Sequence, residues 1–501
     1  MLGKLKTLAG QTAIYGLSSM LGRLLNYLLV PLHTRVFATE QFGVITELYA
    51  YATFIMIVLT YGMETGYFRF SETEKDENRV YSTSLIALLS SSFLFILITS
   101  IFSGQIADFI NYSDHAEYIT WFGIIMAADA FTAIPFARLR QKRKAWKFAF
   151  YKILNISINI LGNLFFLVLC PWILKHNPDS FISNIYSPEI GVGYVFISNL
   201  IASVFTILLL LPEMMKIKMV FDSPLLKKML RYSLPLLVAG LAGMINEALD
   251  RVMLKRLLSP DTNVMSQLGI YGANYKVAVL MTLFIQMFRY AAEPFFFSEA
   301  KSKDAKKMYA DVMKFFIVFC LLIFMGVMFY IDIVKHFIGA GFHEGIKIVP
   351  IILMANLFLG IIINLSIWYK LTNYTRYGAY IAIFGAVITI LLNVLLVPLD
   401  NPYFGGYMGA AWTHFICYFL MMILSYFMGQ KYYKIKYDLK TIFIYIGVAV
   451  GFFFLAAYLR TTNFWLNIGF GTMLLLIFIL FVVWKENLVE YLVRGKGGKR
   501  L

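Results

Sequence analysis

The chain contains fourteen apolar runs, each about twenty residues long and separated by short polar connections. At 1.5 Å per residue, an α-helix of that length crosses the roughly 30 Å hydrocarbon core of a bilayer. Lipid leaves only helices or closed barrels as spanning structures, and continuous rather than alternating apolar runs exclude the barrel. We therefore predict an all-α integral membrane protein with spans at 8–31, 42–66, 80–103, 117–137, 148–171, 190–211, 231–257, 268–296, 312–331, 346–368, 377–399, 406–428, 441–459 and 464–484.

The charge of the chain supports the same class. Charged residues make up 14% of the sequence, whereas a soluble domain carries about a quarter. The net charge of +16 would suggest nucleic-acid binding in a soluble protein. Here lysine and arginine gather in the connections between spans, as the positive-inside rule requires, so no nucleic-acid partner is predicted.

The basic connections fix the orientation. With the N-terminus inside, the even-numbered connections face the cytoplasm, and these are the basic ones: 69–79, 138–147, 216–231, 301–314, 370–376, 431–440 and the tail 485–500. Both termini are therefore predicted to be cytoplasmic and the number of spans to be even. The one local exception is a cluster around Lys255, at the outer end of the seventh span.

The sequence contains an internal repeat. Gly43, at the start of the second span, recurs as Gly269, 226 positions later. Pro171 closes the fifth span and Pro398 closes the eleventh, 227 positions later, and Gly193 and Gly409 are related by an offset of 216. We predict two six-helix halves in parallel orientation, 1–220 and 221–430, followed by two extra helices and a basic tail at 431–501.

Three segments resemble a known family. They are the entry into the second span, Glu40 to Val44, the exit from it, Tyr61 to Phe70, and the end of the eighth span, Phe288 to Phe297. The chain resembles the polysaccharide-exporting branch of the multidrug/oligosaccharidyl-lipid/polysaccharide flippase superfamily. The resemblance implies two six-helix lobes around a central cavity.

The resemblance also implies a function. Members of the branch flip undecaprenyl-diphosphate-linked oligosaccharides from the cytoplasmic to the outer leaflet of the bacterial cytoplasmic (inner) membrane. These lipids feed the biosynthesis of O-antigen in lipopolysaccharide, of capsule or of exopolysaccharide. The implied partners are the lipid-linked oligosaccharide, the bilayer and other polysaccharide assembly proteins, and no enzyme activity is expected.

Four cations inside spans are candidate substrate-binding residues: Arg23, Lys152, Lys276 and Arg289. A charge inside a span costs about 2.5–3.5 kcal/mol on insertion scales, so it usually faces a cavity or a partner. A diphosphate needs such cations in a low-dielectric path. The alternative is local pairing, because Arg289 and Glu293 are four residues apart on one helix face.

The fifth span carries a polar stripe of Lys152, Asn155, Asn159 and Asn163, which share one helix face. Amides beside a cation suit sugar hydroxyls and phosphate oxygens, which makes Asn155 and Asn159 further candidates for substrate binding. Asparagines inside spans also form hydrogen bonds between neighbouring helices. The sequence leaves both interpretations open.

The seventh span contains Glu247 and Asp250, which we consider as an ion-coupling site for Na⁺ or H⁺. The alternative is that Glu247 and Arg251, four residues apart, neutralise each other. Glu47 and Asp129 are further carboxylates inside spans for which the sequence suggests no partner. No other cofactor is expected, and no metal-ligand spacing is found.

The residues argue against two other functions and leave a third open. A membrane-embedded glycosyltransferase or polymerase would need catalytic residues at a membrane face, and the longest outer connection, 172–189, shows no such arrangement. A cation-coupled multidrug exporter of the same superfamily favours acidic cavities, which the four internal cations argue against. A flippase for the lipid precursor of peptidoglycan handles the same lipid diphosphate, so the sequence does not separate it from the polysaccharide flippase.

Overall fold

The computed structural model describes residues 21–22, 24–259, 261–300, 302–372 and 374–487, and this part of the chain is helical without strands. In these described ranges, twelve helices are long and apolar enough to span a membrane, and a thirteenth span results if α12 and α13, bent by 45°, count as one. These thirteen coincide with thirteen of the predicted spans, which confirms the fold class. The first predicted span, 8–31, lies largely outside the described residues.

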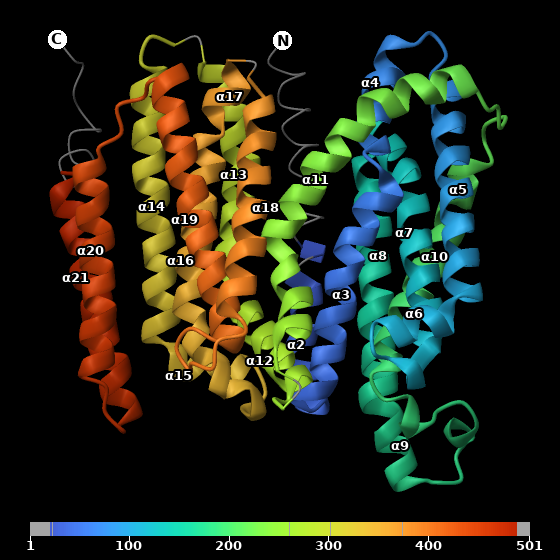
Figure 1. Cartoon of the computed structure of the whole chain (residues 1–501), viewed down its shortest axis with the longest axis horizontal. Coiled ribbons are helices and arrows are strands. Elements are labelled where there is room, and N and C mark those ends of the chain that lie inside the picture. Colours follow the sequence, from blue (N-terminus) through green and yellow to red (C-terminus); the bar gives the residue numbers. More distant parts are fainter. Residues whose placement is uncertain (1–20, 23, 260, 301, 373, 488–501) are drawn as a thin grey trace. The chain divides into compact units, whose positions relative to one another are not determined.

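Contacts divide the chain into two units, and the helices are shown in Figure 1. Unit 1 comprises residues up to Gly272 and Ala386–Ala410, and unit 2 comprises Ala273–Gly385 and the residues from Ala411 onward. Unit 1 contains α2 (Leu29–Val36), α3 (Thr39–Thr60), α4 (Met63–Thr73), α5 (Glu77–Ile101), α6 (Ser103–Phe109), α7 (Ala116–Gln141), α8 (Ala145–Leu164), α9 (Cys170–His176), α10 (Gly193–Met214), α11 (Ser223–Leu257) and most of α12 (Val264–Val277). Unit 2 contains α13 (Val279–Glu299), α14 (Ala305–Phe329), α15 (Ile331–Val334), α16 (Val349–Leu365), α17 (Ile367–Leu371), most of α19 (Gly406–Tyr432), α20 (Leu439–Tyr458) and α21 (Phe464–Lys485).

The helix α18 (Arg376–Leu396) contributes to both units. The helix α11 follows residue 220, where the repeat predicts the second half to begin, yet it packs on α3 and α4 of unit 1. The two units are defined by contacts between residues, whereas the predicted boundaries 1–220, 221–430 and 431–501 are based on the sequence repeat. The units therefore do not test these boundaries, which stay a prediction.

The second span is broken between α3 and α4. Tyr61 and Gly62 both adopt left-handed backbone conformations, with φ of 33° and 68°. Glycine takes this conformation without steric cost, and a Cβ at Gly62 would lie 2.9 Å from the carbonyl oxygen of Ser233 on α11. The break turns α4 so that Met63 and Tyr67 are buried in an apolar cluster with residues of α5, α7, α10 and α11.

One proline differs from the prediction, and a second lies inside a curved helix. The prediction that Pro171 closes the fifth span is wrong, because the helix continues through α9 to His176. Proline lacks the amide N–H of a regular α-turn, and here a π-helical stretch at Phe165–Leu169 precedes it and accommodates the irregularity. Pro235 lies inside α11, whose strong curvature is visible in Figure 1.

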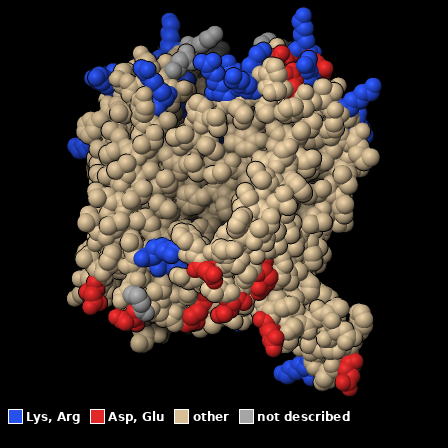
Figure 2. Space-filling model, turned by 45° about the vertical axis from the view of Figure 1, so that its right-hand side comes forward, with Lys and Arg blue, Asp and Glu red and all other residues tan. Residues whose placement is uncertain are grey.

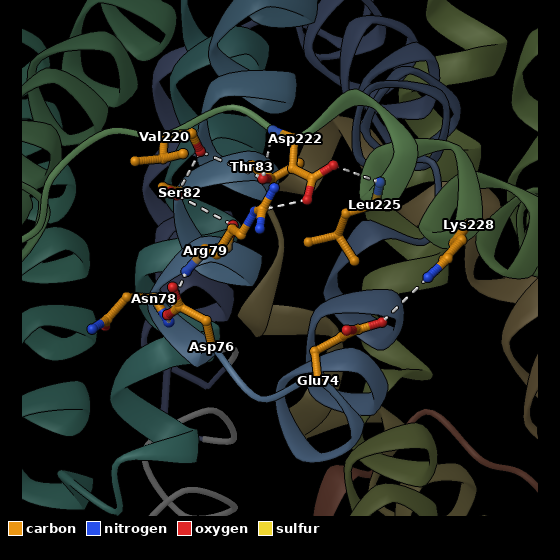
Figure 3. Close-up of polar contacts among 10 residues, drawn as sticks. All are labelled: Glu74, Asp76, Asn78, Arg79, Ser82, Thr83, Val220, Asp222, Leu225 and Lys228. Atoms are coloured by element: carbon orange, nitrogen blue, oxygen red, sulfur yellow. Dashed lines mark hydrogen bonds and ion pairs between the residues drawn. The ribbon is translucent and has the colours of Figure 1, made fainter.

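The connection between α10 and α11 is fixed to the start of α5 (Figure 3). Arg79 Nε lies 2.7 Å from Asp222 Oδ2, and the Ser82 hydroxyl donates a hydrogen bond of 2.7 Å to the carbonyl oxygen of Val220. Asp222 also caps α11, because its Oδ1 accepts a hydrogen bond from the amide of Leu225. The position where α11 begins is therefore determined by unit 1.

The C-terminal hairpin of α20 and α21 packs against α14 within unit 2. Lys314 Nζ of α14 lies 2.5 Å from Glu486 Oε2, just beyond the end of α21, and both side chains are 13% exposed. The Tyr445 hydroxyl of α20 donates a hydrogen bond of 2.7 Å to the other oxygen of Glu486. One buried carboxylate thus joins three helices.

Replacing Lys314 with methionine is expected to lower stability by about 3 kcal/mol, because the Glu486 carboxylate is left without its cation in a largely buried position. The thermal unfolding midpoint of the purified protein in detergent measures the effect. Lys440→Met, at an exposed lysine near the start of α20, is the control and should unfold with the wild type. An unchanged midpoint for Lys314→Met would show that the pair does not hold the hairpin in place.

Candidate substrate path

Charged side chains gather at the ends of the spanning helices. On the face shown in Figure 2, lysine and arginine lie mainly along one edge and aspartate and glutamate along the opposite edge. We call the end of each unit that carries the predicted cytoplasmic connections its basic end. In unit 1 it contains Glu213 of α10, which is 5% exposed and pairs with Lys144, Lys147 and Lys216.

Two asparagines of the polar stripe on α8 join neighbouring helices. Asn155 donates hydrogen bonds to the carbonyl oxygen of Ala202 (3.1 Å) and to Thr206 Oγ1 (2.8 Å), both on α10. Asn163 Oδ1 lies 2.8 Å from Nε2 of His33 on α2, and its amide nitrogen donates to the Asn159 carbonyl oxygen. The geometry therefore shows the interhelical contacts, and a substrate role for Asn155 and Asn159 stays a prediction.

Lys152, at the head of this stripe, is half-buried. Its ammonium lies 4.1 Å from the centre of the Phe136 ring and within electrostatic range of Asp129. Asp129 accepts a hydrogen bond of 2.8 Å from the Ser203 hydroxyl. Within the described ranges Lys152 has no carboxylate at ion-pair distance. Counted from Ala145, it lies about 10 Å along the helix from the basic end.

Lys255 of α11 and Glu47 of α3 form a buried ion pair. Lys255 Nζ lies 2.8 Å from Glu47 Oε2, and the side chains are 9% and 0% exposed. The Tyr112 hydroxyl donates a hydrogen bond of 2.6 Å to the same oxygen, and Lys255 also donates to the carbonyl oxygen of Ile110. This pair explains the lysine of the basic cluster at the outer end of the seventh span, and it supplies a partner for Glu47, for which the sequence suggested none.

The candidate ion-coupling residues differ in their surroundings. Asp250 is 2% exposed, accepts a hydrogen bond from the Tyr271 hydroxyl, and lies 3.8 Å from Arg251 Nη1. Glu247 is exposed, and only its backbone oxygen receives a hydrogen bond from Arg251. Arg251 therefore pairs with Asp250, and not with the Glu247 carboxylate as the alternative supposed. Ion coupling through Glu247 and Asp250 stays a prediction.

In unit 2, Arg289 of α13 is half-buried. The alternative in which it pairs with Glu293 is wrong, because Glu293 Oε1 lies 2.6 Å from Lys370 Nζ of α17. Arg289 has no carboxylate at ion-pair distance among the residues that the structure describes. Counted from Glu299, it lies about 15 Å along α13 from the basic end.

The remaining candidates are placed as follows. Lys276, in the last turn of α12, is exposed. Arg23 lies outside the described residues. His414, a further titratable residue of the twelfth span, is 2% exposed and packs against Tyr275, whose hydroxyl is 3.4 Å from His414 Nε2.

The repeated glycines lie where α3 and α12 cross, which the sequence did not reveal. A Cβ on Gly43 would lie 2.2 Å from the carbonyl oxygen of Met265, and a Cβ on Gly269 would lie 1.9 Å from that of Thr39. Each carbonyl lies four residues before the glycine of its own helix and contacts the glycine of the other helix, so the contact is symmetric between the repeats. Thr39 Oγ1 and Ser266 Oγ, 2.7 Å apart, join the same crossing. Glycine is needed here because the two backbones touch.

More than half of the chain matches a known protein family. The model of the family described as "Polysaccharide biosynthesis protein" covers residues 8–300. The chain belongs to the polysaccharide biosynthesis protein family. No curated protein sequence matches it significantly.

The fold of this family member is found in solved transporters. A structure titled "Lipid II flippase MurJ, inward closed conformation" superposes with a TM-score of 0.72 at 14% identity, over 94% of this chain and 99% of the other. An inward-facing multidrug resistance MATE family transporter of the MOP superfamily superposes with a TM-score of 0.62 at 13% identity, over 83% and 94% of the two chains. Together with the family match, these similarities confirm the predicted membership of the flippase superfamily.

Proposed function

We propose that this polysaccharide biosynthesis protein flips undecaprenyl-diphosphate-linked oligosaccharide from the cytoplasmic to the outer leaflet of the bacterial cytoplasmic membrane. The basic ends of both units face the cytoplasm, as do both termini. The protein acts as a transporter and not as an enzyme. Its product enters the assembly of O-antigen, capsule or exopolysaccharide.

The observation that carries the proposal is a pair of cations inside spans. Lys152 and Arg289 lie about 10 and 15 Å from the basic ends, and neither has a carboxylate at ion-pair distance in the described parts of the chain. A structural cation in a span would normally be neutralised by a partner. Each side chain, within its own unit, is therefore available to the diphosphate of a lipid that enters from the cytoplasmic leaflet, and Arg289 offers the bidentate geometry that phosphate favours.

Neutralising these cations tests the proposal. In cells that lack the protein, lipid-linked oligosaccharide should accumulate where an impermeant glycan-cleaving enzyme added to spheroplasts cannot reach it. Wild type should restore cleavage, while Lys152→Gln with Arg289→Gln should lower it by about a hundredfold or more, because each charged contact to phosphate contributes about 1.5–3 kcal/mol. The charge-preserving variant Lys152→Arg with Arg289→Lys is the matched control and should retain most of the activity.

Two results would count against the proposal. Full restoration by the neutralised variant would mean that these cations do not contact the substrate. An outer-leaflet pool that does not change when the protein is removed would exclude flipping of this lipid altogether.

The second candidate is a flippase for the lipid precursor of peptidoglycan, favoured by the similarity to a structure titled as a lipid II flippase. Both substrates contain the same diphosphate, so the cations do not separate them. Rescue of growth in cells depleted of their own peptidoglycan-precursor flippase distinguishes the two. We expect no rescue, and rescue would shift the assignment to the precursor.

A further inference from the structure

Unit 2 has a groove between α13 and α14 that is not part of the path described above. Its volume is about 720 Å³, within the range of about 300–1,000 Å³ found for small-molecule sites. The apolar part is aromatic: Phe316 lies 5.8 Å from Phe284 and 4.5 Å from Phe288, measured between ring centres. Phe319, further along α14, is 54% exposed. Phe316 itself is buried, so Phe319 and the half-buried Phe284 and Phe288 form the apolar surface that a lipid chain could cover.

The end of the groove nearest the basic end carries three charges of alternating sign, Asp304, Lys307 and Asp311. Their spacing of three and four residues places them on one face of α14. All three are exposed, and within the described residues none of them makes an ion pair, although Lys307 and Asp311 are spaced for one. The groove therefore presents one cation flanked by two carboxylates.

The dimensions fit a single lipid of one leaflet. From Asp304 to Asp311 the helix rises about 10 Å, and from Asp311 to Phe319 about 12 Å. One leaflet contributes about 15 Å of the hydrocarbon core, with a polar headgroup layer outside it. The charges therefore lie at headgroup depth while the phenylalanines lie at the depth of the chains.

We propose that this groove binds a zwitterionic lipid whose head carries a phosphate and a primary ammonium. Lys307 donates to the phosphate, and the ammonium donates to Asp304 or Asp311. Among the residues that line the groove, an anionic lipid would meet two carboxylates, which repel it, and one lysine, which attracts it. A quaternary ammonium has no N–H to donate to them. The alternation of charge thus favours aminophospholipids over anionic lipids and over lipids with a quaternary ammonium.

Native mass spectrometry of the full-length protein in detergent tests the proposal, with phosphatidylethanolamine, phosphatidylcholine and phosphatidylglycerol as probes. We expect phosphatidylethanolamine to be retained about tenfold more than phosphatidylglycerol, and Lys307→Gln to lower its retention by a similar factor. Lys303→Gln, an exposed lysine one residue before Asp304 that does not line the groove, is the matched control and should bind as the wild type does.

A second variant inverts the selectivity. Asp304→Lys with Asp311→Lys leaves three cations on the face of α14 and should change the preference to phosphatidylglycerol. Equal retention of the three lipids, a wild-type preference for phosphatidylglycerol or phosphatidylcholine, or an unchanged preference in the doubly substituted variant would each overturn the proposal. Stronger retention of undecaprenyl phosphate than of phosphatidylethanolamine would also overturn it and assign the groove to the substrate. Size-exclusion profiles confirm that each variant is folded.

Discussion

Replacing Lys255 with methionine is expected to leave little folded protein. Lys255 is the cation of Glu47, whose side chain is 0% exposed and lies inside the second span. Removing one partner of a buried ion pair costs about 3–5 kcal/mol, because the remaining charge is neither solvated nor neutralised. The substitution also removes the hydrogen bond that Lys255 donates to the carbonyl oxygen of Ile110, so α3, α11 and the segment before α7 lose a shared contact.

The yield of monodisperse protein on size exclusion and the thermal unfolding midpoint measure this effect. Glu47→Gln combined with Lys255→Met removes both charges and should recover most of the stability lost by Lys255→Met alone. Lys175→Met, at an exposed lysine of an outer connection, is the control and should match the wild type. If Lys255→Met were as stable as that control, the pair would contribute nothing to the fold.

Replacing Gly269 with alanine is expected to abolish transport while most of the protein still folds. The new Cβ would lie 1.9 Å from the carbonyl oxygen of Thr39 and 3.0 Å from the amide nitrogen of Gly43, so α3 and α12 cannot keep their crossing. The contact lies at the predicted outer end of these helices. A flippase that works by alternating access must close that end, which the added methyl group prevents.

Chemical labelling detects the opened crossing. Ser266→Cys should react slowly with an impermeant thiol reagent and faster once Gly269→Ala is added, because the Oγ atoms of Thr39 and Ser266 are 2.7 Å apart only while the helices touch. The native cysteines are buried. Gly243→Ala, where a Cβ would meet no atom within 4 Å, is the matched control for both labelling and transport. Full transport by Gly269→Ala would show that the crossing need not close.

The spans could be predicted because the cost of placing a residue in lipid depends mainly on the residue itself. Hydropathy along the chain therefore located thirteen described spans without any knowledge of neighbours. The prediction for Pro171 is wrong for the complementary reason. Whether a proline ends a helix depends on whether the preceding turn widens, and the π-helical stretch at Phe165–Leu169 has no sequence signature of its own.

The sequence alone did not predict which charged residues form ion pairs with one another. Glu47 and Lys255 are 208 positions apart, and only the packing of α3 on α11 brings them together. Conversely, Arg289 and Glu293 have ideal spacing for a local pair, yet the Glu293 carboxylate forms its ion pair with Lys370 of another helix. Spacing predicts which residues share a face, but the neighbour opposite that face decides the pairing.

The composition of unit 1 has a consequence for biogenesis. This unit includes α11 and the segment Ala386–Ala410, so its contacts involve residues from most of the 501-residue chain. Domains that fold as units during synthesis can usually complete once their own stretch of chain has emerged. Here the early helices are inserted long before their last partners are translated. The early helices of unit 1 therefore lie in the bilayer without all of their packing partners until residues 386–410 have been translated. Both units then reach their final packing near the end of translation.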